Sequence, residues 1–243
     1  MIDSPPLSRL DPLPRNTLWD SAYAALRAAL MEGRLVPGQR LVLRELADQL
    51  GISLTPVRDA VNRLVAERVL DRGTVGQGGG ATVPLLDADQ FGQLMAVRAG
   101  LEPVATEAAL KHATPEKLDE IEDALLAMKR SAKEAPERYL AEHKRFHFGI
   151  YKLCCMPIMM DVIESAWLRC APTLTLTLPK SGPDLKRYPL HVAALKALRS
   201  GDGAAAASAI RADIESARDD VCRLLTERAS GARMNGKGAA ARR

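Results

Sequence analysis

Aromatic residues are scarce in this sequence: they make up 4% of its 243 residues, and histidine and cysteine occur only four times each. A core with few aromatic rings must rely on aliphatic side chains, and the abundant alanine, leucine and arginine favour helices over strands. No stretch approaches 18 uninterrupted apolar residues, so we expect no membrane span and no membrane partner. The proline-rich residues 1–15 also lack the apolar run of a signal peptide, and we expect them to form a flexible arm.

The four cysteines include no CxxC pair, the spacing that is typical of redox and zinc sites. We therefore expect reduced, idle thiols and a cytoplasmic protein. The formal net charge is +4, but the last 16 residues hold five basic residues and no acid, which leaves −1 for the other 227. The overall charge therefore does not indicate nucleic-acid binding by itself.

The hydrophobic spacing of residues 16–85 predicts a small domain in which a hairpin follows three helices. A glycine-rich stretch between the two strands would form the hairpin tip. This order is typical of a winged helix-turn-helix, whose third helix enters the major groove of DNA. The expected helices and strands lie at 17–32, 43–50, 55–68, 69–70 and 81–83.

The third of these helices carries the residues that we expect to face DNA. Apolar residues occupy one side of it, and the outer face consists of Ser53, Thr55, Arg58 and Asn62. The paired donors of Arg58 can reach guanine, and hydroxyl groups at a helix start suit phosphate oxygens. In the alternative interpretation, Arg58 only forms a surface ion pair with Asp59 or Glu67.

From residue 87 onward almost every segment has helical spacing, so we expect an all-α domain at 87–229. The basic tail at 230–243 is expected to be disordered. The fold class is therefore mainly α, with a small β-hairpin wing. The six expected helices of the second domain lie at 87–112, 114–132, 136–155, 157–178, 184–200 and 202–229.

His143 and His147 are four residues apart, so both rings lie on one face of a helix and can bind one metal ion. Two histidines also occur on one face by chance. The stretch HKRFH has no glutamate after its first histidine, so it lacks the base of the zinc peptidases.

The segments EGRLVPGQRL at 32–41 and LRELADQLGISLTPVRDAV at 43–61, followed by the glycine-rich wing, resemble the GntR family of bacterial transcription regulators. The resemblance implies that Arg44, Thr55 and Arg58 contact DNA, and that a wing residue near Gly78 enters the minor groove. One departure is Leu54, where the family usually has arginine, so one of the family's base or phosphate contacts is absent here.

The segments VRAGLEP at 97–103, RFHFGIY at 145–151 and the stretch from His191 to Asp213 resemble the FCD ligand-binding domain of the FadR subgroup. The resemblance implies a bundle of six or seven helices, and many members hold a divalent metal with one aspartate and three histidines. Here His143 stands at the aspartate position and Asp213 at the last histidine position, while His147 and His191 match.

Three imidazoles and one carboxylate are thus retained, with the carboxylate moved across the site. We predict a working site for Zn²⁺, Ni²⁺ or Mn²⁺. In the alternative, the site has lost its metal, and its polar groups bond to each other and to water.

The same resemblance implies small organic acids as effectors. Arg98 matches an arginine that lies near the ligand in some members, and it could clamp an acid group. Alternatively, Arg98 forms an ion pair with Glu102, four residues away, on the surface or between subunits.

These observations predict a homodimeric transcription regulator, a repressor that binds a near-palindromic operator in double-stranded DNA and responds to an organic acid. A DNA-bound metal sensor is the alternative. A metal-dependent helical enzyme would need a base beside an activated water, and HKRFH offers none, so we expect no enzyme.

Overall fold

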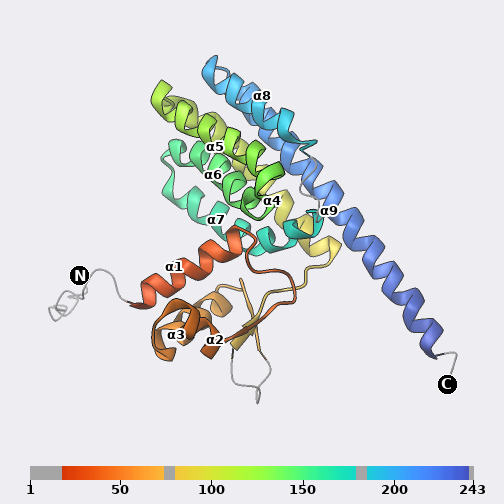
Figure 1. Cartoon of the computed structure of the whole chain (residues 1–243). Helices are drawn as coiled ribbons and strands as arrows, with labels where there is room; N and C mark the ends of the chain where they lie inside the picture. The colour runs from red at the N-terminus through yellow and green to blue at the C-terminus, as the bar shows by residue number, and fades with distance from the viewer. Residues whose placement is uncertain (1–17, 74–79, 179–184, 241–243) are drawn as a thin grey trace, which may run out of the picture.

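The computed structural model describes residues 18–73, 80–178 and 185–240, which form two stacked units (Figure 1). The N-terminal unit combines three short helices with a small sheet, and the second unit is a bundle of longer helices. The fold is therefore mainly α, which confirms the fold class expected from the sequence. The arm expected at 1–15 lies outside the described residues.

The N-terminal unit has the expected order of helices, and Gly51 sets the tight turn in its middle. Gly51 has a φ of 64°, in the left-handed region that favours glycine, and its N–H closes the preceding helix on Ala47 and Asp48. The next helix then starts at once in a new direction. The elements are α1 (Leu18–Met31), β1 (Arg40–Val42), α2 (Leu43–Leu50), α3 (Leu54–Ala66), β2 (Asp71–Arg72) and β3 (Gly80–Thr82).

Helix α3 is fixed by one apolar face that packs against α1. Val57, Val61 and Leu64 recur at the spacing of a helix face and are at most 2% exposed. Helix α1 packs against α3, and its Leu26 and Leu30 are buried in the same core. The opposite face of α3 remains in solvent, and this face carries the polar residues that the sequence assigns to DNA.

The sheet has three strands, whereas the sequence predicts two. Strand β3 lies in the middle and pairs antiparallel with β1 and with β2. β1 escapes prediction because three residues are too few for an alternating pattern, and distant β3 holds them in place. The strand expected at 69–70 lies at Asp71–Arg72, because Val69 and Leu70 are buried residues that close α3.

In the second unit, side-chain caps set the starts of some of the helices, including α4 and α5. Asp87 accepts the N–H of Gln90 at 2.8 Å, and the Gln90 side chain accepts the N–H of Asp87 at 3.1 Å. Thr114 accepts the N–H of Lys117 in the same way. The helices are α4 (Ala88–Ala109), α5 (Pro115–Glu134), α6 (Tyr139–Tyr151), α7 (Pro157–Leu174), α8 (Tyr188–Arg199) and α9 (Gly203–Ala240).

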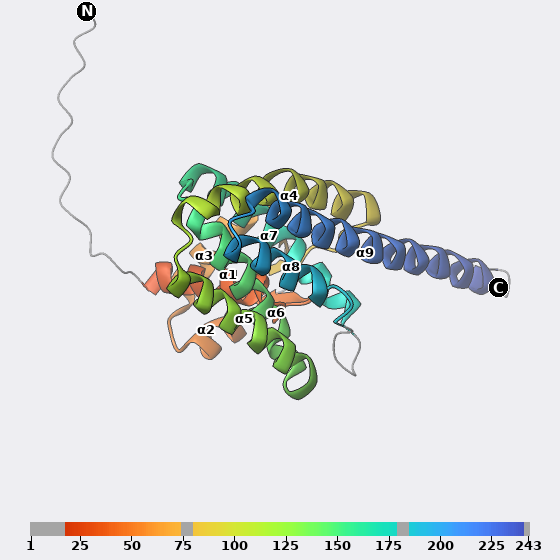
Figure 2. The same ribbon diagram turned by 90° about the horizontal axis from the view of Figure 1, so that it is seen from above.

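Helix α9 continues further than the sequence analysis predicts. It packs along α4 and α8 and then runs away from the body of the molecule to Ala240 (Figure 2). The disorder expected at 230–243 is therefore wrong for residues 230–240. Three glycines in this segment disfavour a helix, but its alanines and basic residues favour one, and each further residue extends an existing helix at low cost.

None of the helices in the described parts of the chain combines the length and the hydropathy needed to cross a membrane.

The two units are joined by contacts of α1 with α6 and α7. Arg27 of α1 donates to Glu164 of α7 at 2.6 Å. Glu32, just after α1, pairs with Lys144 of α6. Burial and the neighbouring cations act in opposite directions on Glu32, and the cations dominate because its pKa is lowered. The N-terminal unit is therefore held against the helix that carries His143 and His147.

Candidate metal centre and nucleic-acid interface

Four of the residues that the sequence assigns to DNA are exposed in the N-terminal unit. Arg44 is on α2, Ser53 directly precedes α3, and Thr55 and Arg58 are in the first turns of α3. Gly78, assigned to the wing, lies outside the described residues. The four described candidates are thus all exposed to solvent.

Arg58 has no hydrogen bond or ion pair with any residue of the described ranges. Glu67, one of its two possible partners, accepts from Arg63 at 2.8 Å and from the hydroxyl of Tyr23 at 2.7 Å. The surface ion pair considered for Arg58 is therefore not formed. Its guanidinium is available to a partner.

Ser53 occupies the N-cap position of α3, but its side chain makes no capping hydrogen bond. Its hydroxyl and the first N–H groups of α3 are left without partners from a cap. Such groups at a helix start suit the oxygens of a phosphate.

The four predicted metal ligands lie together in the core of the second unit. His143 and His147 project from α6, His191 from α8 and Asp213 from α9. One ligand atom from each lies within 4.8 Å of the others. The spacing of the first two residues follows from the sequence, while the approach of α8 and α9 is a result of tertiary packing.

Hydrogen bonds fix which nitrogen of His191 carries a proton. Its Nδ1 is 2.9 Å from the carbonyl oxygen of Arg187, and a carbonyl can only accept. Nδ1 is therefore protonated, and the lone pair of the neutral ring lies on Nε2.

The same reasoning applies to His147 through a longer chain of hydrogen bonds. The Tyr151 hydroxyl donates its one proton to Glu102 at 2.6 Å, so it must accept from Nδ1 of His147 at 2.8 Å. The free lone pair of His147 is therefore also on Nε2.

The two lone pairs face each other, which is the central physical feature of the cluster. Nε2 of His147 lies 3.2 Å from Nε2 of His191, and the Asp213 carboxylate lies 3.5 Å from the first and 3.6 Å from the second. Nε2 of His143 lies 3.0 Å from the same Nε2 of His147. Two lone pairs and a carboxylate at this distance repel one another unless a cation or a donated N–H, such as that of a neutral His143, lies between them.

Unpartnered polar atoms support the same conclusion. Oδ1 of Asp213 and Nδ1 of His143 are buried without a hydrogen bond among the described residues. Buried polar atoms rarely lack a partner, and each exception needs a cause. The donor set of three imidazoles and one carboxylate fits a divalent transition metal such as zinc.

Burial also keeps the imidazoles in the form that binds metals. Desolvation lowers the pKa of His143 and of His147 well below the usual value. Neighbouring histidines and the Arg98 guanidinium lower both pKa values further. The rings are therefore neutral near pH 7.

Behind the histidines lies a buried acid that the sequence analysis considered only as a partner of Arg98. Glu102 is fully buried and accepts from Arg98 at 2.6 Å, from Tyr151 at 2.6 Å and from Trp167 at 2.8 Å. The sequence could have indicated the role of Tyr151, because Tyr151 follows His147 by four residues and so lies on the same face of the helix. No pattern in the sequence indicates the role of Trp167.

Arg98 forms the ion pair with Glu102, but in the core and not on the surface. It is 2% exposed, and its guanidinium lies 4.0 Å from the centre of the Trp167 ring. Burial is the largest single effect and acts to lower the pKa of Arg98, but the charge and hydrogen bond of Glu102, together with Cys170 and Tyr151, raise this pKa above its usual value. Arg98 is therefore a permanent cation beside the cluster.

A small cavity of about 20 Å³ adjoins the cluster, and Arg98, His143, Arg187 and Asp213 are among the residues that line it. This space holds about one water molecule. Arg187, which the sequence analysis did not select, lies 3.8 Å from Oδ1 of Asp213 through its Nε atom.

Comparison with known families assigns both units. Residues 18–83 match the family described as "Bacterial regulatory proteins, gntR family". Residues 93–216 match the family described as "FCD domain". The two matches meet near the boundary between the two units of the structure.

Known proteins resemble the chain over most of its length. The HTH-type transcriptional regulator McbR of Escherichia coli (strain K12) is 33% identical over 178 residues, which cover 71% of this chain and 79% of that protein. The Nta operon transcriptional regulator of Aminobacter aminovorans is 32% identical over 129 residues, covering 53% of this chain and 60% of that protein. The solved structure of E. coli McbR/YncC superposes with a TM-score of 0.76 and 27% identity, and it covers 88% of this chain and 99% of that one.

Proposed function

Because the chain belongs to the GntR family of bacterial transcription regulators and carries an FCD domain, we propose that it is a metal-assisted, ligand-responsive repressor. It acts in the cytoplasm as a homodimer, and each subunit reads one half of a near-palindromic operator. It has no enzymatic function. The convergence of His143, His147, His191 and Asp213, with two imidazole lone pairs facing each other, is the observation that carries the proposal.

In this proposal, Arg58 reads a base in the major groove through its paired donors. Arg44, Ser53 and Thr55 contact phosphates and set the position of α3 on the duplex. Gly78 lets the wing approach the minor groove. The exposed, unpaired state of Arg58 supports its role.

His143, His147, His191 and Asp213 would hold Zn²⁺, Ni²⁺ or Mn²⁺. The bound metal supplies a Lewis acid with coordination positions for the oxygens of an organic acid. The chain itself orients two of the ligands, because Tyr151 and the Arg187 carbonyl fix the lone pairs of His147 and His191 on Nε2.

The organic acid is assigned to the cavity beside His143, between Arg98 and Arg187. Both guanidiniums already have acidic partners, Arg98 in Glu102 and Arg187 in Asp220 at 2.8 Å. The two arginines therefore supply a positive field beside the cavity. At about 20 Å³ the cavity is too small for such a ligand, so its walls must move apart when the acid binds.

This movement can reach the N-terminal unit, here called the DNA-reading unit, through direct contacts. Helix α6 carries His143 and, next to it, Lys144, which pairs with Glu32 at the end of α1. A shift of α6 therefore moves α1, on which α3 packs. A coupling of about 1–3 kcal/mol would change operator affinity by about 5- to 150-fold.

The test is the operator affinity of the purified protein under three conditions: without metal, with metal, and with metal and a panel of small dicarboxylic acids. The proposal requires a change of fivefold or more when an acid joins the metal-loaded protein. Operator binding that responds to no acid in either metal state would contradict it.

A second candidate is a sensor for which the metal itself is the signal. The size of the cavity favours a metal sensor, because the cavity leaves room for an ion and a water molecule only. The same titration separates the two candidates. A sensor changes its operator affinity with metal alone and shows no further change with any acid.

A further inference from the structure

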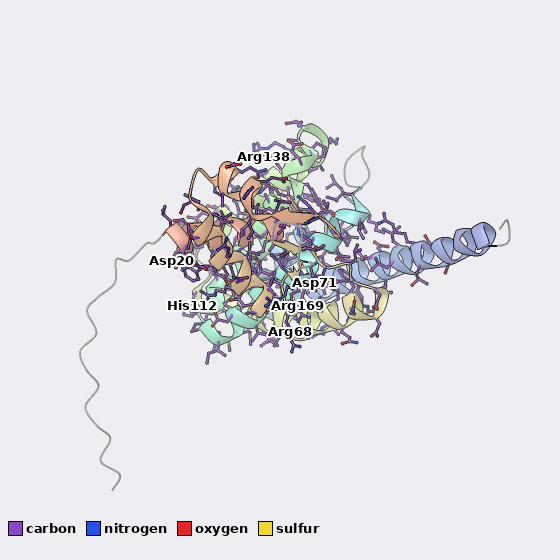
Figure 3. The ribbon with its side chains drawn as sticks, turned by 90° about the horizontal axis from the view of Figure 1, so that it is seen from below. Asp20, Arg68, Asp71, His112, Arg138 and Arg169 are labelled. Atoms are coloured by element: carbon purple, nitrogen blue, oxygen red, sulfur yellow. The ribbon has the colours of Figure 1, made fainter. Side chains whose placement is uncertain are left out.

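Three arginines surround a hollow between the DNA-reading unit and the helical unit. Arg68 lies two residues after the end of α3, Arg72 lies on β2, and Arg169 projects from α7 on the other side. Figure 3 shows Arg68 and Arg169 close together with Asp71 on the face seen from below. The hollow has a volume of about 370 Å³, which is within the usual range of small-ligand sites.

The charge of this hollow is not balanced. Asp71 is the one acid among the described residues that line it, so three guanidiniums face a single carboxylate. Within the described ranges, none of the three guanidinium groups makes a hydrogen bond or an ion pair. Arginines elsewhere at the boundary between the units behave differently, since Arg27 is paired with Glu164.

The backbone at Arg68 is a second and independent observation. Arg68 has a φ of 58° and follows Glu67, the C-cap of α3. This position favours glycine, because a β-carbon is strained in the left-handed region. The turn at the end of α3 requires this conformation, but glycine would adopt it without strain, so the choice of arginine points to a role for its side chain. Arg68 places a guanidinium at the hollow.

The rest of the lining suits a ligand with an uncharged part. Apolar side chains, Leu86 among them, form part of the wall. Gln90 uses its carbonyl oxygen to cap α4, which leaves its NH₂ group as a further donor. The hollow therefore offers several donors for oxygen atoms and an apolar surface next to them.

We propose that this hollow binds a small molecule with at least two negative charges on phosphate groups, between the DNA-reading unit and the helical unit. Guanidinium groups bind phosphate oxygens through paired hydrogen bonds, and three of them around one space match a diphosphate better than a single carboxylate. Because the arginines come from both units, the bound anion would hold the two units together. This site is separate from the histidine cluster and does not depend on the proposed metal.

Inorganic pyrophosphate is the probe, and calorimetry on the full-length protein at low ionic strength is the measurement. Wild-type protein should bind pyrophosphate, and Arg169→Gln should lower the affinity tenfold or more. Arg211→Gln is the matched control, because Arg211 is exposed on α9 and outside the hollow. Equal affinities of the wild type, Arg169→Gln and the control would overturn the proposal, as would no binding by the wild type.

Arg68→Gly separates binding from stability. Glycine removes the backbone strain, so the melting temperature should stay the same or rise, while pyrophosphate affinity should fall tenfold or more. Retained affinity in this variant would contradict the role of Arg68.

Two further outcomes would also overturn the proposal. Pyrophosphate chelates metals, so the titration is repeated in a His147→Ala background. Binding that disappears there would place the anion at the histidine cluster. A loss of operator affinity in Arg169→Gln without pyrophosphate would assign the guanidiniums to DNA.

Discussion

Arg58 lies on the outer face of α3 with its guanidinium free, while the apolar face of the same helix is buried. Its removal should therefore leave the fold intact. Arg58→Ala should weaken operator binding by about 1–3 kcal/mol, the usual value of a bidentate base contact, with an unchanged melting temperature. The measurement is operator affinity at fixed salt concentration.

Arg130→Ala is the control for this variant, since Arg130 is an exposed arginine of α5, far along the chain from α3. It should bind the operator like the wild type. If Arg58→Ala also binds with wild-type affinity, α3 is not the reading helix.

Tyr151 supports the candidate metal centre without being a ligand. It accepts from Nδ1 of His147 and donates to Glu102, so it holds the lone pair of His147 toward the other ligands. Tyr151→Phe should keep the helix content and lower metal affinity by about 10- to 100-fold, the usual effect of losing such a partner. Competition with a metal-binding dye measures this directly, and an unchanged affinity would show that the tautomer is fixed in another way.

At the scale of the elements, α6 connects the histidine cluster to the N-terminal unit. His143 faces the cluster, and the adjacent Lys144 reaches Glu32. Lys144→Ala should reduce the coupling between effector and operator by about 0.5–2 kcal/mol, with little change in operator affinity when no effector is present. Operator titrations with and without the effector measure this coupling free energy.

Arg145→Ala is the matched control, because Arg145 is the next residue and pairs only within α6, with Glu142. It should keep the full response. If Lys144→Ala also keeps it, the signal does not pass through the contact with Glu32.

Elements with strong periodicity could be predicted from the sequence, and elements held by distant partners could not. The face of α3 formed by Val57, Val61 and Leu64 is visible as a pattern, and so is the i, i+4 pair of α6. Strand β1 is three residues long and exists because Leu41 lies opposite Ala81. The burial of Glu102 beneath Trp167 depends on the packing of α4 against α7, which no local pattern records.

The end of α9 shows a different limit. Its glycines, alanines and basic residues predict disorder because they offer no apolar stripe to pack. The segment nevertheless continues a helix that α4 and α8 already hold, since adding a residue to an existing helix costs little. The composition of this segment shows that it has no apolar face to bury, but it does not show that the segment can extend a helix that is already formed.

At the scale of the whole molecule, the candidate metal centre ties α6, α8 and α9 together, and α6 also contacts the DNA-reading unit. A ligand that binds only the folded state stabilises it by mass action, by about 2.7 kcal/mol at a free concentration 100 times the Kd. Metal should therefore raise the melting temperature of the whole protein. The rise in melting temperature should require ligands from all three helices, α6, α8 and α9.

The most direct measurement is the melting temperature of protein stripped by a chelator and then titrated with Zn²⁺, Ni²⁺ or Mn²⁺, together with the metal content of the purified protein. We predict bound metal near one ion per subunit and a rise of several degrees with at least one of these ions. His147→Ala should lose most of this rise. Asp213→Asn, which keeps the shape but removes the charge, should lose part of it. A metal-free protein whose melting temperature does not respond to any of the three ions would contradict the account, because the facing lone pairs of His147 and His191 would then have no cation to explain them.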